Sequence, residues 1–213
     1  MKFRGAFFDA DGTLLETESI QLAAWNDTLK KYDIELSESD YMPYAGMGTG
    51  AVSADLIKKY SIGIDAESLA SIKRAKTNEL LLKANIEEMP FARESISYFC
   101  SKGMRIAIYS NAYRSETRIK LSKTGFDKIV DRVFCRDDVE SGKPCPDIYL
   151  LACRSFSLSP KECFAVEDTK DGVKSAKSAG LYAIAVPNKY TRNQYFSDAD
   201  YIANDMKEVM SVF

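Results

Sequence analysis

Polar residues with chemically useful side chains follow three apolar segments that are typical of buried strands. The three pairs are Asp9 with Asp11, Ser110 with Asn111, and Glu167 with Asp168. Parallel strands align their carboxyl ends at one edge of a sheet, where open α/β sheets bind ligands. Lys143 lies between the last two pairs, in a turn braced by Pro144 and Pro146. We therefore expect carboxylate, hydroxyl, amide and ammonium groups to converge at one edge of a sheet.

The first pair has the spacing of two side chains that point to the same side of an extended chain. Residues two apart in a strand are separated by about 7 Å, at roughly 3.3 Å per residue. Asp9 and Asp11 would share one space, and their repulsion raises the pKa of one carboxyl unless a cation lies between them. This arrangement predicts a nucleophile that stays ionised beside a carboxyl group that carries a proton. Taken alone, the stretch could also be a strand followed by an acidic turn.

The acidic residues at these strand ends offer the hard oxygen ligands that Mg²⁺ prefers. Asp9, Glu167 and Asp168 would leave coordination positions for water and for a substrate oxygen. Lys143 and Ser110 offer a cation and a hydroxyl group, both suited to phosphate oxygens. A phosphate dianion would be repelled by the carboxylates unless Mg²⁺ and the lysine offset their charge. The pattern therefore predicts a magnesium ion and a phosphate group in one site.

Each of these residues has an ordinary structural explanation when it is considered alone. Lys143 could be a solvated surface lysine, and Ser110 could satisfy the backbone of its own turn. Glu167 and Asp168 could cap the helix that follows them. The order and spacing of all the groups together favour an active site over a set of unrelated caps and turns.

The composition excludes several other chemistries. The 213 residues include no histidine, which excludes Ser-His-Asp, Cys-His and histidine-rich zinc sites. Five cysteines without a C-x-x-C pair argue against a disulfide framework or a metal finger and favour a reducing cytoplasm. A formal net charge of −2 gives no electrostatic case for nucleic acid or a membrane surface. No apolar run approaches the ~20 residues of a membrane span, and the first residues do not resemble a signal peptide.

Strand and helix patterns alternate along the second part of the chain and predict an α/β fold. The strands expected after the first are residues 105–109, 132–135, 163–166, 182–186 and 201–202. The preceding segment shows helical patterns over 17–33, 52–60 and 66–84, with a glycine-punctuated loop over 42–50. We expect a doubly wound parallel sheet with a helical insertion after its first strand.

Four motifs, in this order, resemble the signature motifs of the haloacid dehalogenase superfamily. They are Asp9-Ala10-Asp11-Gly12-Thr13, Ser110-Asn111, Gly142-Lys143-Pro144 with Pro146-Asp147, and Glu167-Asp168 with Asp171-Gly172. The resemblance covers essentially the whole chain and is nearest the branch of β-phosphoglucomutase and small sugar-phosphate and phosphoglycolate phosphatases. It implies a Rossmann-like core domain of residues 1–16 and 87–213, and a helical cap domain of residues 17–86.

The resemblance also implies a role for each motif. Asp9 would attack phosphorus and form an aspartyl-phosphate, while Asp11 would protonate the leaving alcohol and then accept a proton from water. The carboxylates of Asp9 and Asp168 and the backbone carbonyl of Asp11 would hold Mg²⁺, with Glu167 binding directly or through water. The groups that would stabilise or cradle the phosphate are Ser110, Lys143, Asn111 and the backbone around Gly12.

Three positions bear on the reaction within this family. β-Phosphoglucomutase carries a histidine in its first cap helix and an arginine in the next glycine loop, where this chain has Gln21 and Thr49. Glutamine does not exchange protons as histidine does, and threonine does not grip a second phosphate, so hydrolysis is favoured over mutase activity. True dehalogenases of the superfamily lack the second aspartate of the first motif, so Asp11 argues against dehalogenation.

Substrate selectivity is expected to come from the cap, which the resemblance implies closes over the sheet domain. The candidate substrate contacts are Gln21, Tyr44, Met47 and Thr49. Few charges are expected there, which favours a small neutral polyol or sugar phosphate over a polyanion. Cys145, next to the motif that contains Lys143, could simply fill space or could have a redox role.

The leading hypothesis is a Mg²⁺-dependent phosphatase that acts on a small phosphorylated metabolite, such as a sugar, polyol or glycolate phosphate. The alternatives are a phosphosugar mutase similar to β-phosphoglucomutase and a non-catalytic binding or regulatory protein on the same fold. Without targeting signals, the chain is expected to be cytoplasmic and to be a monomer or weak dimer.

Overall fold

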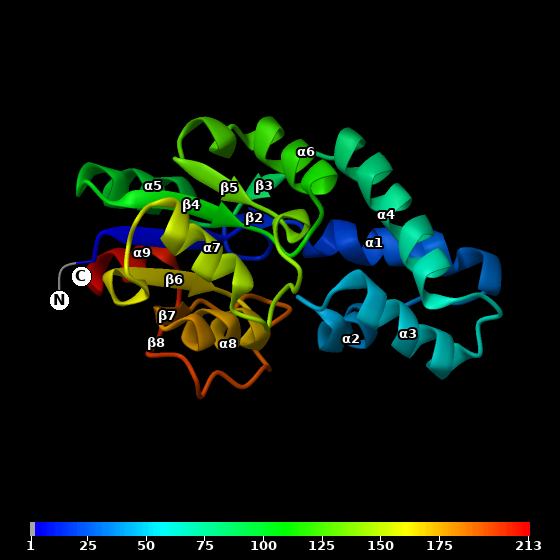
Figure 1. Ribbon diagram of the computed structural model, residues 1–213. Coiled ribbons are helices and arrows are strands. Elements are labelled where there is room, and N and C mark those ends of the chain that lie inside the picture. The colour runs from blue at the N-terminus through cyan, green and yellow to red at the C-terminus, as the bar shows by residue number, and fades with distance from the viewer. Residues whose placement is uncertain (1–2) are drawn as a thin grey trace.

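A six-stranded parallel sheet lies at the centre of the computed structural model, which describes residues 3–213 (Figure 1). The strand order is β5-β4-β1-β6-β7-β8. These strands are β1 (Gly5–Asp9), β4 (Arg105–Tyr109), β5 (Arg132–Phe134), β6 (Cys163–Glu167), β7 (Tyr182–Ala185) and β8 (Tyr201–Ile202). The order runs outward in both directions from the central pair β1 and β6, as in doubly wound folds. The expected fold class is confirmed.

β1 is buried completely because it has parallel neighbours on both sides and helices above and below. It pairs with β4 and with β6. Phe8 packs in one core layer with α5 (Ala92–Ser101) and α9 (Met206–Ser211). Phe7 packs in the opposite layer with two further helices, α7 (Asp147–Ser155) and α8 (Lys170–Ala179). Burial on both faces explains why the strand is an uninterrupted apolar run up to its final aspartate.

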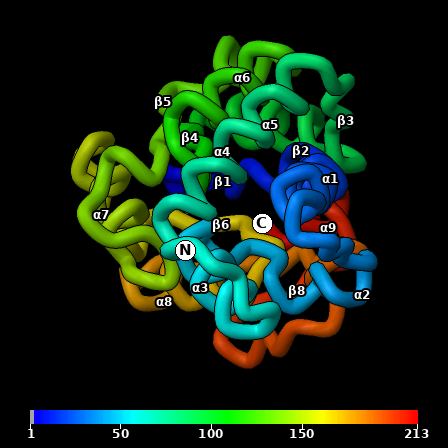
Figure 2. Tube along the Cα trace, turned by 90° about the vertical axis from the view of Figure 1, so that its right-hand side faces the viewer, coloured from blue at the N-terminus to red at the C-terminus, as the bar shows by residue number. Residues whose placement is uncertain are grey.

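Four helices that follow the first strand form a separate body with its own core, which we call the helical lobe. They are α1 (Glu18–Leu29), α2 (Glu38–Tyr41), α3 (Thr49–Tyr60) and α4 (Ala66–Lys83). Trp25, Val52, Leu56 and Leu69 are buried within this core. Figure 1 shows the lobe beyond one end of the sheet, and Figure 2 shows α1, α3 and α4 in front of the central strands.

The two connections between the lobe and the sheet run side by side. β2 (Leu15–Glu16) leads into α1, β3 (Glu87–Glu88) leads out of α4, and the two short strands pair antiparallel. The lobe also contacts the sheet domain on two further sides. One is formed by α6 (Arg114–Thr124), which packs against α4. The other includes the ion pair between Lys189 and Glu38, whose charged atoms are 2.6 Å apart. The lobe therefore covers the edge at which the parallel strands end.

The prediction of a glycine-punctuated loop over residues 42–50 is wrong in part. Met42–Tyr44 form a 3₁₀ turn, and α3 begins at Thr49 rather than at residue 52. The short α2 before this turn was not expected. It starts at a capping box, in which Ser37 and Asp40 satisfy each other's backbone N–H groups. Local side-chain capping, rather than apolar periodicity, creates this helix.

The remaining elements are short 3₁₀ turns at residues Lys30–Tyr32, Phe126–Lys128, Arg136–Asp138 and Pro160–Glu162. Within residues 3–213, no helix combines the length and the apolar character needed to cross a lipid bilayer.

Candidate active site

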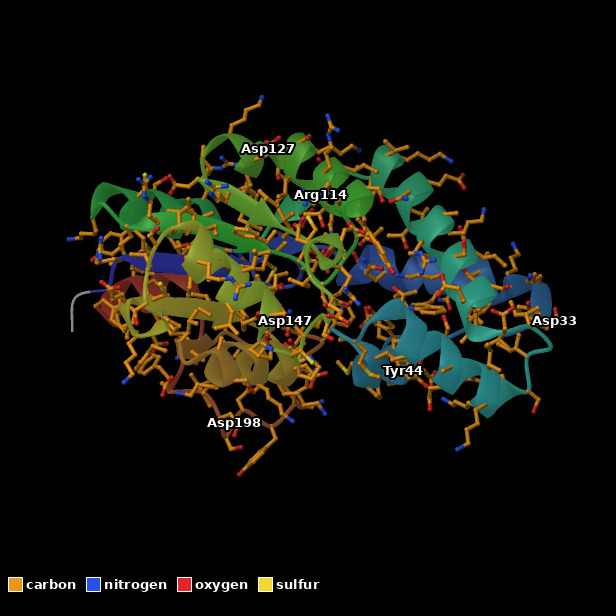
Figure 3. The ribbon with its side chains drawn as sticks, viewed as in Figure 1. Asp33, Tyr44, Arg114, Asp127, Asp147 and Asp198 are labelled. Atoms are coloured by element: carbon orange, nitrogen blue, oxygen red, sulfur yellow. The ribbon has the colours of Figure 1, made fainter. Side chains whose placement is uncertain are left out.

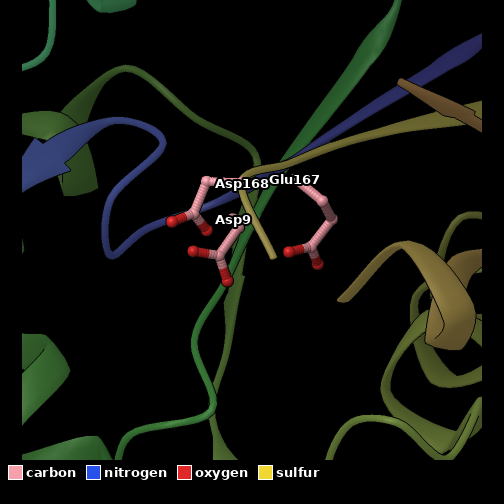
Figure 4. A group of neighbouring side chains, drawn as sticks. All are labelled: Asp9, Glu167 and Asp168. Carbon is pink, nitrogen blue, oxygen red and sulfur yellow. The ribbon is translucent and has the colours of Figure 1, made fainter. Parts of the chain in front are cut away.

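The ends of β1 and β6 bring three acidic side chains together. Phe8 pairs with Val166 in these neighbouring strands, so Asp9 and Glu167 follow at the same level. Asp168 is the next residue after β6. Each of the three offers a carboxylate oxygen that lies within 4.8 Å of the others, and all three residues are buried. Figure 4 shows their side chains gathered beyond the strand ends.

Lys143 provides the positive charge inside this acidic group. Its buried ammonium group forms an ion pair with Asp9 and lies 2.5 Å from Glu167 Oε1. Asn111 helps to fix the turn, because its Oδ1 accepts a hydrogen bond of 3.2 Å from the backbone N–H of Lys143. Tyr149, which the sequence did not single out, donates its hydroxyl hydrogen to Glu167 Oε1. The turn and the strand ends are thus joined through their functional side chains.

The acidic group carries strongly shifted pKa values. Burial raises the pKa of the Asp9 carboxyl to about 8, although the ion pair with Lys143 opposes this shift. Burial also raises the pKa of Asp168 well above its usual range, and the charge of Asp9 adds to the effect. A cation held among these carboxylates would favour their ionised forms.

Asp11 has a different environment from Asp9. Its carboxylate accepts hydrogen bonds from the hydroxyl groups of Thr17 at 2.6 Å and Ser110 at 2.8 Å. The ammonium group of Lys120 lies 2.6 and 2.7 Å from its two oxygens. Burial favours the neutral acid, but these contacts outweigh it and lower the pKa of Asp11.

The pKa values of the two aspartates are therefore shifted in opposite directions. The pKa of Asp9 is raised and that of Asp11 is lowered. The cause is Lys120, which contacts both oxygens of Asp11, while Lys143 divides its charge between Asp9 and Glu167. Nothing in the sequence pattern indicated that Lys120 would be buried at this place.

The donor set fits a divalent cation. Glu167 Oε2 is buried and, among the residues described, has no hydrogen-bond partner. A side chain at position 172 would collide with this carboxylate, so Gly172 leaves it room. Asp9, Glu167 and Asp168 together offer only oxygen ligands, as a hard cation such as Mg²⁺ prefers. These are the residues that could hold a metal ion.

Gly12 and Asn188 shape the other side of the acidic group. Gly12 has φ of +79°, and a Cβ atom there would collide with the side chains of Asp168 and Asn188. Asn188 Nδ2 donates to Asp168 Oδ2 at 2.7 Å and to the Gly12 carbonyl oxygen at 3.0 Å. Sequence reasoning missed Asn188, although it follows the apolar strand β7 as the other polar groups follow their strands.

A cavity of about 330 Å³ lies between the strand ends and the helical lobe. Five of the sequence-predicted core residues line it, namely Asp9, Asp11, Asn111, Lys143 and Asp168. Ser110, Glu167 and Gly12 lie behind this lining layer, where they contact Asp11, Lys143 and Asn188 respectively.

The four predicted lobe residues also line the cavity: Gln21, Tyr44, Met47 and Thr49. Tyr44, which Figure 3 labels in the lobe, is largely buried and donates its hydroxyl hydrogen to Asp55 at 2.5 Å. Gln21 uses its amide to donate to Glu116 and to accept from Lys73. Met47 is 40% exposed, so it lies at the mouth of the cavity.

The expectation of few charges in this region is wrong. Charged residues from both bodies line the cavity, namely Glu18, Glu67, Lys73, Arg74, Glu116 and Arg136. Several of them lie on helices that carry charged residues on all sides. The sequence pattern therefore did not distinguish the charged residues that face the cavity from those that face solvent. The cavity can therefore accept a strongly polar molecule.

Comparison with known proteins identifies the family. Residues 6–186 match the model of the haloacid dehalogenase-like hydrolase family. The chain therefore belongs to the haloacid dehalogenase-like hydrolases, and the resemblance seen in its four motifs is confirmed.

Similar proteins cover nearly all of the chain. Protein CbbY of Rhodobacter capsulatus is 31% identical over 97% of this chain and 95% of its own length. The fructose-1-phosphate phosphatase YqaB of Escherichia coli (strain K12) is 27% identical over 87% of this chain and 97% of its own. The crystal structure of CbbY from Rhodobacter sphaeroides in complex with phosphate has a TM-score of 0.87 at 26% identity, covering 97% of this chain and 96% of that one. These relatives confirm the expected enzyme class, a phosphoric monoester hydrolase.

Proposed function

We propose that this protein is a Mg²⁺-dependent phosphatase that hydrolyses a small phosphorylated carbohydrate through an aspartyl-phosphate. The observation that carries the proposal is the pair of differently placed aspartates at the end of β1. Asp9 lies in an all-oxygen acidic group with Lys143, while Asp11 lies apart with its own lysine. In this proposal, Asp9 would attack phosphorus and Asp11 would transfer the proton.

The metal would be held by the carboxylates of Asp9 and Asp168 and the backbone carbonyl of Asp11, with Glu167 as a direct or water-mediated ligand. Among residues 3–213, no group donates a hydrogen bond to Glu167 Oε2, which supports this assignment. When bound, Mg²⁺ would offset the negative charge of the phosphate and of the carboxylates around it. Asn188 would hold Asp168 in the orientation required, since it donates to Asp168 Oδ2.

The protein groups then divide the reaction into two steps. Asp9 attacks phosphorus, the bond from phosphorus to the leaving oxygen breaks, and Asp11 gives that oxygen a proton. Asp11 next takes a proton from water, which attacks the phosphoryl group and frees Asp9. Lys143 and Ser110 stabilise the charge on the transferring group, and Asn111 with the backbone around Gly12 completes the cradle.

We infer that the helical lobe is the cap, comprising residues 17–86, and that the core domain comprises residues 1–16 and 87–213. The paired strands β2 and β3 join the two parts, and the lobe covers the strand ends. Gln21, Tyr44, Met47 and Thr49 would contact the leaving group, together with the charged residues that line the cavity. Closure would exclude water until the substrate is bound.

A phosphorylated sugar is the substrate class that we favour. One relative is named as a phosphatase of fructose 1-phosphate. The charged lining supports a leaving group with several polar groups. All five cysteines are free thiols, which supports a reducing cytoplasm, and we expect a monomer or weak dimer.

The test is phosphate release from a panel of sugar, polyol and glycolate phosphates, with Mg²⁺ or with EDTA, using the wild type and Asp9→Asn. We expect release that needs Mg²⁺ and that is lost in the variant. Conversion of hexose phosphate isomers after addition of a bisphosphate, without phosphate release, would favour the mutase. Release that persists in Asp9→Asn would contradict the proposed nucleophile. No turnover in either assay would favour the non-catalytic alternative.

A further inference from the structure

Glu167 extends into the acidic group on a longer side chain than either aspartate. Its additional rotatable bond raises the entropic cost of holding the carboxylate in one orientation. Oε2 has no hydrogen-bond partner among residues 3–213, and it lies against Gly172, whose missing side chain leaves it room. The orientation of this carboxylate therefore depends on the two groups that contact Oε1, the ammonium group of Lys143 and the hydroxyl group of Tyr149.

Of these two contacts, the one from Tyr149 is reserved for Glu167. The ammonium group of Lys143 also forms an ion pair with Asp9, and the proposed reaction gives it the transferring phosphoryl group as a further partner. The Tyr149 hydroxyl donates its single hydrogen to Glu167 Oε1. Tyr149 is completely buried on α7 and does not line the cavity, so it cannot contact a substrate there.

The neighbouring Tyr109 separates the role of the ring from that of the hydroxyl group. Tyr109 and Tyr149 are both completely buried in one core layer, with their ring centroids 4.6 Å apart. The hydroxyl oxygen of Tyr109 has no hydrogen-bond partner in the described part of the chain. Apolar packing therefore accounts for both rings, and phenylalanine would fill the same space. The directed hydroxyl of Tyr149, whose burial costs free energy unless it is hydrogen-bonded, requires a separate explanation.

Resting on the proposed function, we propose that Tyr149 is a positioning residue for the magnesium site, where its hydroxyl group holds the Glu167 carboxylate in place for Mg²⁺. Groups that orient the ligands of a metal ion contribute to the affinity for that ion. Because Tyr149 touches neither the substrate nor the reacting atoms, its loss should weaken Mg²⁺ binding. It should leave turnover at saturating Mg²⁺ close to that of the wild type.

The experiment measures Mg²⁺ binding in the absence of substrate. The melting temperatures of wild type and Tyr149→Phe are recorded at increasing Mg²⁺ concentrations, and their dependence on concentration gives the dissociation constant. We expect Tyr149→Phe to raise this constant about tenfold. Steady-state kinetics at saturating Mg²⁺ should then give a kcat within about threefold of the wild type on the best phosphate of the panel.

Tyr109→Phe is the matched control, because it removes an equally buried hydroxyl group that has no hydrogen-bond partner among the residues described. Its dissociation constant for Mg²⁺ should equal that of the wild type. In a Glu167→Ala background, Tyr149→Phe should cause no further loss of affinity, since the hydroxyl acts through Glu167. Circular dichroism checks the fold of each variant. Tyr149→Met, which also lacks the hydroxyl group, carries the test if Tyr149→Phe does not fold.

An unchanged dissociation constant in the folded Tyr149 variant, or an equal rise in Tyr109→Phe, would overturn the proposal. A large loss of kcat that saturating Mg²⁺ does not restore would also overturn it, because the hydroxyl group would then serve the reaction rather than the metal site. A wild type that Mg²⁺ does not stabilise would instead contradict the proposed function, so the two failures are distinguishable.

Discussion

Two buried lysines line the same cavity from opposite sides, and their surroundings differ. Lys143, at the sheet edge, forms ion pairs with Asp9 and Glu167, and these carboxylates raise its pKa against the effect of burial. Lys73, in the helical lobe, donates to the neutral amide of Gln21 and lies 5.5 Å from the ring centroid of Trp25. Burial lowers the pKa of Lys73.

This difference in surroundings distinguishes the part of the cavity at the sheet edge from the part in the helical lobe. At the sheet edge, each cation has its own acidic partner, so the groups are held in position before a substrate arrives. Within residues 3–213, Lys73 has no carboxylate at ion-pair distance, which leaves its charge available to a ligand. We infer that the sheet edge performs the reaction and that the lobe selects the leaving group.

Replacing Lys73 tests most directly whether the lobe selects the leaving group. We expect Lys73→Met to raise KM for the best sugar phosphate about tenfold with little change in kcat, because one charge-assisted hydrogen bond to the ligand is lost. Steady-state kinetics with Mg²⁺ measure both constants.

Lys143→Met is the matched control for that prediction. It removes a buried lysine of the same size from the sheet edge and should lower kcat instead, by about 100-fold or more. A fall in kcat for Lys73→Met as large as that for Lys143→Met would contradict the division between the two parts.

Glu18 provides a second test of the lobe, through the pH dependence of the unfolding free energy. It is a buried lobe acid that accepts a hydrogen bond of 2.5 Å from Tyr41, and burial raises its pKa to about 7. The folded state therefore favours the neutral acid. The contribution of Glu18 to the unfolding free energy is fully present below pH 4.5 and is lost as pH rises through 7. Because glutamine does not ionise, Glu18→Gln removes this pH-dependent loss of stability. Relative to wild type, we expect it to gain about 2 kcal/mol of unfolding free energy between pH 5 and pH 8.

Urea unfolding of both proteins at the two pH values measures this gain. Glu35→Gln, at an exposed glutamate of the lobe, is the control and should show no such dependence. An equal effect of Glu18→Gln at both pH values would show that Glu18 does not titrate in this range.

The sheet edge was predictable because strand ends follow a simple rule. Polar residues after buried apolar runs identified Asp9, Ser110 and Glu167, and parallel pairing brought their strands together. The same rule would have found Asn188, which follows the strand predicted over residues 182–186 with one proline between them. The limits of the strands themselves agree with the sequence patterns to within one residue or so.

The lobe and the lysine partners were less predictable for a physical reason. Lys120, Glu116 and Lys73 lie on helices with many charged residues, where periodicity does not distinguish a buried charge from a solvated one. Their burial depends on how α1, α4 and α6 pack, which is a property of the tertiary structure. Consequently the charge of the cavity was predicted wrongly.

Capture of the phosphoryl group on Asp9 tests the central claim most directly. The Asp11→Asn variant, in which attack by water should be slowed, is mixed with Mg²⁺ and p-nitrophenyl phosphate, whose leaving group needs no proton from Asp11, and is quenched in acid. Mass spectrometry of its peptides then locates the added phosphoryl group. The account predicts that it is on Asp9 and is absent when EDTA replaces Mg²⁺. Phosphate release without any label on Asp9, or a label on another residue, would contradict it.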